Sequence, residues 1–101
     1  MKKPSHISHY LILKDLINGI DVRQYNDSIR YLTSRIENIK RDFVKYGLQF
    51  EETMKPTTYS YYKPYTLTND KHNIQKAKEL LKVYHTHQVK KFLDEVQESR
   101  N

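Results

Sequence analysis

A regular run of apolar residues between Asp27 and Gly47 is the feature that most constrains the fold of this chain. These residues recur at steps of three and four, which is the spacing of one face of an α-helix. They are Ile29, Leu32, Ile36, Ile39 and Phe43. Asn26 or Asp27 suits the first position of such a helix, and Gly47 can adopt the left-handed conformation that ends it. We therefore expect one amphipathic helix from Asp27 to Gly47.

The face opposite this apolar stripe is basic and rich in hydrogen-bonding groups. Arg30, Ser34 and Arg41 point away from the stripe, and Tyr31 and Asn38 lie at its edges. Arginine, hydroxyl and amide side chains are groups that bind phosphates and base edges in the DNA major groove. The alternative is an ordinary solvated helix face.

The residues before this helix predict a shorter helix and then a short strand. We expect the first helix to run from about Ser8 to Ile17, with Ser5 or Ser8 as its N-cap. The Asn18-Gly19 pair ends it, and residues 20–22 follow as a very short strand. Helix, tight connection and helix is the outline of a helix-turn-helix.

After Gly47 the hydrophobic period changes from 3.6 toward 2, as expected for β-strands. Two strands, from Leu48 to Glu52 and from Tyr59 to Tyr65, are joined by a loop from Thr53 to Thr58. Pro64 has no N–H to donate, so the second strand should lie at an edge or contain a bulge. This segment predicts a β-hairpin.

The C-terminal segment predicts one long helix from Asn69 or Asp70 to about Gln97. Its narrow apolar stripe consists of Ile74, Ala77, Leu81, Tyr84, Gln88, Phe92 and Val96. An unbroken helix of about 28 residues would be roughly 42 Å long, which exceeds what a small core can cover. We therefore expect a homodimer formed through this helix. The expected division is residues 1–68 and residues 69–101, the second part serving packing or dimerisation.

The order of these elements resembles a winged helix-turn-helix DNA-binding domain. The segments ILKDLINGIDV and TSRIENIKRDFVKYG are similar to small phage and bacterial proteins of this family, and the resemblance covers about Ile7 to Leu67. We accordingly expect an α+β fold with a β-hairpin wing and a long C-terminal helix. The resemblance implies sequence-specific binding of double-stranded DNA. The protein would then be a transcriptional regulator or an accessory architectural factor of a phage or mobile element.

The resemblance also assigns candidate contacts on the basic helix, whose N-terminal half would face base edges in the major groove. The residues expected at bases are Arg30, Tyr31, Ser34 and Asn38. Arg35 would lie near the helix flank, and Arg41 would bind phosphate. Three alternatives remain: Tyr31 in the core, Arg35 in a salt bridge, and Glu37 repelling phosphates.

In the wing, Lys55 at the tip and Lys63 nearby would contact the DNA backbone or the adjacent minor groove. The tyrosines of the hairpin have two readings. Alternate tyrosines can pack the sheet against the helices, whereas exposed Tyr61 and Tyr62 would stack on unpaired bases and bind single-stranded nucleic acid or RNA.

Composition favours a small nucleic-acid-binding module over other classes. The 101 residues include 18 Lys and Arg against 12 Asp and Glu, a formal charge of +6 that favours polyanionic partners. The chain has no Cys, its two glycines cannot build a phosphate-cradling loop, and its five His lack metal-ligand spacing. We expect no enzymatic activity, no cofactor and no metal.

No apolar run approaches the roughly 18 residues that span a bilayer, and the N-terminus lacks the apolar region of a signal peptide. We expect a cytoplasmic protein without a membrane partner. The alternative function is a protein-interaction module, in which the same fold binds a host protein through the long C-terminal helix. Two features favour this alternative: the C-terminal helix is longer than a small core can cover, and Glu37 lies on the outward face of the basic helix.

Overall fold

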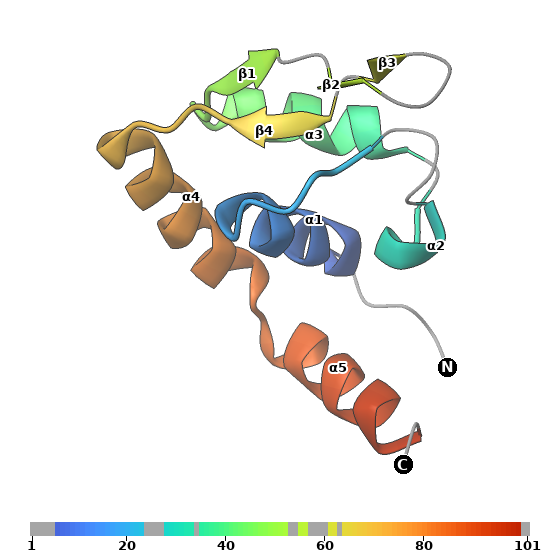
Figure 1. Cartoon of the computed structure of the whole chain (residues 1–101). Helices are drawn as coiled ribbons and strands as arrows, with labels where there is room; N and C mark the ends of the chain where they lie inside the picture. Colours follow the sequence, from blue (N-terminus) through green and yellow to red (C-terminus); the bar gives the residue numbers. More distant parts are fainter. Residues whose placement is uncertain are drawn as a thin grey trace.

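The computed structural model describes residues 6–23, 28–33, 35–52, 55–56, 61–62 and 64–99, and it shows an α+β fold (Figure 1). The helices are α1 (Ile7–Ile17), α2 (Ser28–Tyr31), α3 (Ile36–Lys45), α4 (Lys71–Tyr84) and α5 (His87–Ser99). The strands are β1 (Phe50–Glu52), β2 (Lys55–Pro56), β3 (Tyr61–Tyr62) and β4 (Tyr65–Leu67). The predicted α+β class is confirmed.

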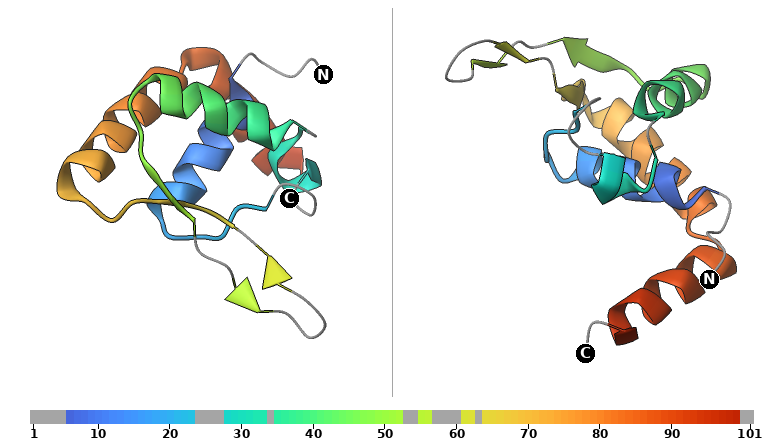
Figure 2. Two further views of the ribbon diagram at one scale, coloured as in Figure 1. Left: turned by 90° about the horizontal axis from the view of Figure 1, so that it is seen from above. Right: turned by 90° about the vertical axis from the view of Figure 1, so that its right-hand side faces the viewer.

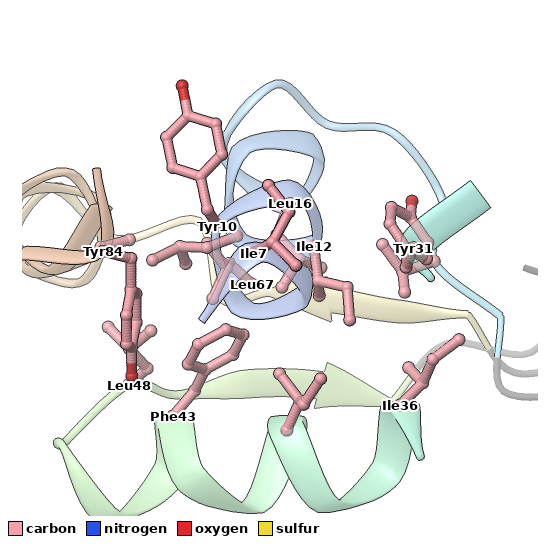
Figure 3. Packing of buried hydrophobic residues seen from close by; sticks show 14 of the residues in the cluster. Ile7, Tyr10, Ile12, Leu16, Tyr31, Ile36, Phe43, Leu48, Leu67 and Tyr84 are labelled. Atoms are coloured by element: carbon pink, nitrogen blue, oxygen red, sulfur yellow. The ribbon is translucent and has the colours of Figure 1, made fainter. Parts of the chain in front are cut away.

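Helix α1 forms the centre of the fold. It is buried around most of its circumference, because α2, α4 and β4 all pack against it (Figure 1). Its buried apolar residues are Ile7, Tyr10, Ile12, Leu13 and Leu16. Figure 3 shows Ile36 and Phe43 of α3 pointing toward this cluster. The other elements are therefore assembled around α1.

The start of α1 differs from the prediction and its end agrees with it. His6 occupies the N-cap position with a φ of 68° and no side-chain cap. Ser8 lies inside the first turn, where its buried hydroxyl has no hydrogen-bond partner among the described residues. Ser8 as N-cap was therefore wrong, and Ser5 lies outside the described residues. At the other end, Asn18 follows the helix and Gly19 has a φ of 74°, as the Asn-Gly pair predicts.

The segment after Gly19 joins the hairpin as a single bridge. Val22 pairs with Tyr65 in an antiparallel bridge, and the Tyr65 N–H donates a 2.8 Å hydrogen bond to the Val22 carbonyl. Tyr65 also lies opposite Glu52 in β1. The predicted short strand is thus reduced to Val22, on the edge of β4 that β1 leaves open.

The predicted helix from Asp27 to Gly47 is not one helix, so this prediction was wrong. The segment forms two helices, α2 and α3, and the break begins at Leu32, whose φ of 58° is left-handed. The Thr33 hydroxyl accepts a 3.1 Å hydrogen bond from the Arg35 N–H, so a side chain replaces the helical carbonyl. Leu32 fits the apolar spacing and so hides this break, yet it is 40% exposed. The end of α3 agrees with the prediction, since Gly47 follows with a φ of 92°.

The β-hairpin follows α3, but its turn lies further along the chain than predicted. Strand β1 pairs with β4 and β2 pairs with β3, all antiparallel and in one continuous register. The connection between β2 and β3 is therefore residues 57–60, and the loop predicted from Thr53 to Thr58 was wrong. The outer part of this ribbon extends beyond the helices (Figure 2).

The C-terminal segment forms two helices, so the prediction of one long helix was also wrong. Thr86 separates them and caps α5, because its hydroxyl accepts a 3.2 Å hydrogen bond from the Val89 N–H. The break changes which side of α5 faces the core: Val89 is fully buried, whereas Gln88 is exposed. Asp70 caps α4 as predicted, since its side chain accepts from the Asn73 N–H.

A buried amide attaches the start of α4 to the hairpin. The Asn73 carbonyl oxygen accepts a 2.8 Å hydrogen bond from the Gln49 N–H. Its amide nitrogen donates to the carbonyls of Gln49 and Thr68, at 2.9 and 3.0 Å. Because each polar atom of this amide has a partner, burying it costs little. These bonds hold α4 against the segments that lead into β1 and out of β4.

Candidate nucleic-acid interface

The side of α3 that faces away from the core carries polar and basic residues. Ile36, Ile39 and Phe43 are buried on the inner side, so positions about half a helical turn away face solvent. The exposed residues on that side are Asn38, Arg41 and Lys45, and together with Arg35, which is exposed at the N-cap, we call them the α3 outer face. Asn38, Arg41 and Lys45 follow at steps of three and four, so they form one line along the helix.

Two acidic residues, Glu37 and Asp42, lie beside this line, and each is held by a partner. Glu37 lies 3.7 Å from Arg41 across one helical turn, and its other carboxylate oxygen accepts a 3.3 Å hydrogen bond from the Tyr65 hydroxyl. Both Glu37 and Arg41 are well exposed, so their ion pair contributes little free energy and leaves the guanidinium accessible. Arg35, Arg41 and Lys45 therefore make the α3 outer face net positive, even with Glu37 beside it.

The hairpin holds α3 in a defined orientation. The Lys40 ammonium lies 5.6 Å from the centre of the Phe50 ring and 5.7 Å from that of Tyr65. Cation–π contacts of this kind favour the arrangement and direct Lys40 toward the ribbon. Lys40 is therefore a packing residue between α3 and the ribbon.

A polar and aromatic contact joins α3 to α1 on the inner side. His9 Nε2 lies 3.0 Å from a carboxylate oxygen of Asp42. The His9 ring also lies 5.1 Å from the ring of Tyr84 and 5.9 Å from that of Phe43. Burial, and then the nearby Tyr46 and Asp42, raise the pKa of Tyr84 from 10.0 to about 12. The Tyr84 phenol is therefore neutral at physiological pH and serves packing.

Two of the predicted base-contacting residues, Tyr31 and Arg30, make structural contacts with α1. Tyr31 is 1% exposed, and its hydroxyl donates a 2.8 Å hydrogen bond to Asp15 of α1. Arg30 binds the same carboxylate oxygen at 3.0 Å and lies over the Tyr31 ring. The prediction that Tyr31 lies at the DNA surface was therefore wrong, and the alternative that it lies in the core is confirmed. The break beyond Leu32 also removes Arg30 from the helix that carries the α3 outer face.

Of the other residues predicted to contact DNA, the structure describes four, and two fall outside the described residues. Arg35, Asn38 and Arg41 are exposed and lie together on the α3 outer face. Lys55 lies in β2, so its predicted place at the hairpin tip was wrong. Ser34 and Lys63 fall outside the described residues. The sequence analysis missed Lys45, although its spacing of four from Arg41 indicates the same face.

Comparison of the chain with protein-family models, with curated proteins and with solved structures found no match. Across the described ranges, no group of three or more His, Asp or Glu residues is arranged to bind a metal ion. None of the helices within those ranges is both long and apolar enough to cross a lipid bilayer.

Proposed function

We propose that this chain is a winged helix-turn-helix protein that binds double-stranded DNA, with the α3 outer face in the major groove. The observation that carries the proposal is the alignment of Asn38, Arg41 and Lys45 on the exposed side of a helix whose other side is buried. An α-helix fits the major groove, where amide and guanidinium groups bind base edges and cations bind phosphates.

The order of elements supports the winged-helix part of this proposal. A helix, a single-residue strand at Val22, two helices and a hairpin follow one another as the resemblance implies. The outer half of the hairpin extends past the helices (Figure 2), so it would lie along the DNA beside α3 as the wing. A transcriptional regulator or an accessory architectural factor is the corresponding biological role.

The roles within the α3 outer face follow from charge and position. Arg41 and Lys45 lie toward the C-terminal half of α3 and supply charge for phosphates. Asn38 is uncharged and lies in the first turn of α3, where side chains of a recognition helix contact bases. Its amide can bind both N6 and N7 of adenine, a pairing that discriminates against other bases by about 1–3 kcal/mol.

Duplex DNA binding by fluorescence anisotropy across a salt series tests the proposal. For five to eight neutralised phosphates, the log-log slope of affinity against salt should be about −4 to −7. In the double variant R41Q/K45Q, binding to random-sequence DNA should weaken and the slope should become less steep by about 2. The fold should be retained, because both side chains are exposed.

The matched control is K78Q/K82Q, which removes the same charge from exposed positions of α4. This control should bind DNA nearly as wild type. Equal weakening in the two double variants would show attraction by net charge alone, and failure of the folded wild type to bind duplex at low salt would exclude the proposal. Arg30→Glu is a poor test, because it would place a second carboxylate against the partly buried Asp15.

The single-strand and RNA alternative is tested by competition in the same assay. The hydroxyl of Tyr65 binds Glu37 and its ring lies near Lys40, so this tyrosine packs the ribbon against α3. The side chains of Tyr61 and Tyr62, to which this alternative was assigned, lie outside the described residues. If the proposal holds, unlabelled duplex should displace labelled duplex better than a single strand of equal length and sequence. Preferential displacement by the single strand would favour base stacking on the hairpin instead.

A further inference from the structure

The C-terminal end of α3 lies against a lysine from another helix. Lys45 is the last residue of α3, and Gly47 follows two positions later. Helix α4 runs beside this end of α3 (Figures 1 and 2). A Cβ at Gly47 would lie 3.3 Å from the ammonium nitrogen of Lys76, so the glycine leaves the space in which that side chain lies. Two lysines that are far apart in the sequence, Lys45 and Lys76, are thus brought to the same end of α3.

The backbone that carries Lys76 is held in place by its neighbours on α4. Asn73 lies almost one helical turn earlier, and its amide makes hydrogen bonds of 2.8 and 2.9 Å with the N–H and the carbonyl of Gln49. Gln49 comes two positions after Gly47, so this part of α4 is fixed beside the end of α3. Ala77, next to Lys76, is fully buried. The Lys76 side chain therefore starts from a rigid position, which lowers the entropy cost of using it in binding.

The two lysines at this end of α3 are exposed cations without an acidic partner. Within the described part of the chain, no carboxylate forms an ion pair with either of them. The carboxylate one turn away on each helix has another partner. On α3, Asp42 lies 3.0 Å from His9, and on α4 the Glu79 carboxylate accepts a 3.4 Å hydrogen bond from Gln75. Both ammonium groups are therefore accessible to an anion from outside the chain.

We propose that Lys76 of α4 binds a phosphate of the DNA backbone, next to the phosphate contact of Lys45. The contact depends on the proposed function, in which Lys45 supplies charge for phosphates at this end of α3. A lysine binds phosphate as a point charge on a flexible stem, so it needs to be within reach and does not need a fixed geometry. The DNA-binding surface then continues from α3 onto one side of α4.

A cation at the C-terminal end of a helix also stabilises the helix itself, because it offsets the negative end of the helix dipole. Such a local role for Lys76 would change the stability of the protein. It would leave the salt dependence of DNA binding by the folded protein unchanged. The two roles are therefore separated by measuring both quantities on the same variant.

Fluorescence anisotropy of duplex DNA across a salt series tests the contact in the full chain. Lys76→Gln should make the log-log slope less steep by about 1, and at about 0.1 M salt it should weaken binding by roughly fivefold to tenfold. Lys78→Gln is the matched control, because Lys78 is also exposed but lies two positions further along α4, on another side of the helix. This control should bind as wild type, and Lys76→Arg, which keeps the charge, should keep the slope.

The other outcomes each have a distinct meaning. A wild-type slope in Lys76→Gln, together with weakened binding in R41Q/K45Q, would overturn the Lys76 contact and leave the proposed function intact. If that variant also had a lower midpoint of thermal denaturation, Lys76 would serve only to stabilise the end of α3. Equal weakening in Lys76→Gln and Lys78→Gln would show an effect of net charge and would also overturn the contact. Failure of the folded wild type to bind duplex would remove the proposed function and this contact together.

Discussion

Asp15 of α1 binds Arg30 of α2 through an ion pair of 3.0 Å between Oδ2 and Nη2. The same oxygen accepts the hydrogen bond of the buried Tyr31 hydroxyl. One carboxylate thus attaches the four-residue helix α2 to the central helix. A helix this short has almost no stability of its own, so its position depends on such contacts.

This arrangement predicts an order of stabilities for three variants. Asp15→Ala should lower the free energy of unfolding most, by about 1–3 kcal/mol, because it removes both the acceptor that the buried Tyr31 hydroxyl uses and the partner of Arg30. Tyr31→Phe should cost about 0.5–1.5 kcal/mol, since Asp15 keeps Arg30. Arg30→Ala should cost less than about 1 kcal/mol, because Arg30 is half-exposed. Urea denaturation measures all three, and Arg30→Ala as the most damaging change would contradict this account.

Asn73→Ala should be more damaging than any of these. The substitution removes three hydrogen bonds and leaves the Gln49 N–H without its acceptor, at a cost of about 2–4 kcal/mol, although the Gln49 and Thr68 carbonyls each keep a backbone N–H donor. Asn69→Ala is the matched control, because Asn69 is exposed and lies two residues before the start of α4. The same denaturation experiment applies, and similar losses for the two variants would show that the buried amide has no special role.

Gly47→Ala should destabilise the junction between α3 and the hairpin. Its φ of 92° is left-handed, where an added Cβ costs about 1 kcal/mol, and that Cβ would lie 3.3 Å from the Lys76 ammonium. Gly19→Ala is the comparison, because its φ of 74° is also left-handed but no atom lies within 4 Å of the added Cβ. Thermal denaturation should show a loss in both and a loss at Gly47 at least as large. A neutral Gly47→Ala would contradict the observed backbone.

The raised pKa of the Tyr84 phenol predicts how the free energy of unfolding changes at alkaline pH. The unfolded chain releases this phenolic proton near pH 10.0, and the folded protein releases it near pH 12. A raised folded-state pKa means that this contribution to stability is complete below pH 10 and is lost as pH rises through 12. The stability difference between wild type and Tyr84→Phe should therefore shrink or reverse in sign over this range. A difference that stays constant from pH 8 to pH 12 would argue against burial of the phenol.

Local signals in the sequence predicted the ends of elements well. The Asn-Gly pair after α1, the glycine after α3 and the Asp70 cap of α4 all lie where their chemistry requires them. The alternation after Gly47 predicted a hairpin, and the spacing of Ile36, Ile39 and Phe43 predicted the inner side of α3. Each of these signals acts over a few residues, so it does not depend on the rest of the fold.

The two helix breaks could not be predicted from periodicity because each one preserves an approximate apolar repeat. Leu32 continues the stripe of α3 although it lies in a turn, and Thr33 reveals the turn only through its hydrogen bond to Arg35. Thr86 has the same effect before α5, where it caps a new helix. Hydroxyl residues compete with the helical backbone, and whether they succeed depends on tertiary contacts. The hydrogen bond of Tyr31 with Asp15 is one such contact, made between residues that are 16 positions apart in the sequence.

The position of Tyr65 has a consequence for the order in which the chain assembles. Its N–H binds Val22, far away in the sequence, while its neighbours in β1 lie close along the chain. The strands of the hairpin can pair early, because they are close in the sequence. The bridge to Val22 closes a long loop and forms only when α1 and the hairpin are packed together. Exchange of the Tyr65 amide hydrogen with solvent therefore requires the segment at Val22 to leave β4, so its rate reports on that separation and not on fraying between β1 and β4.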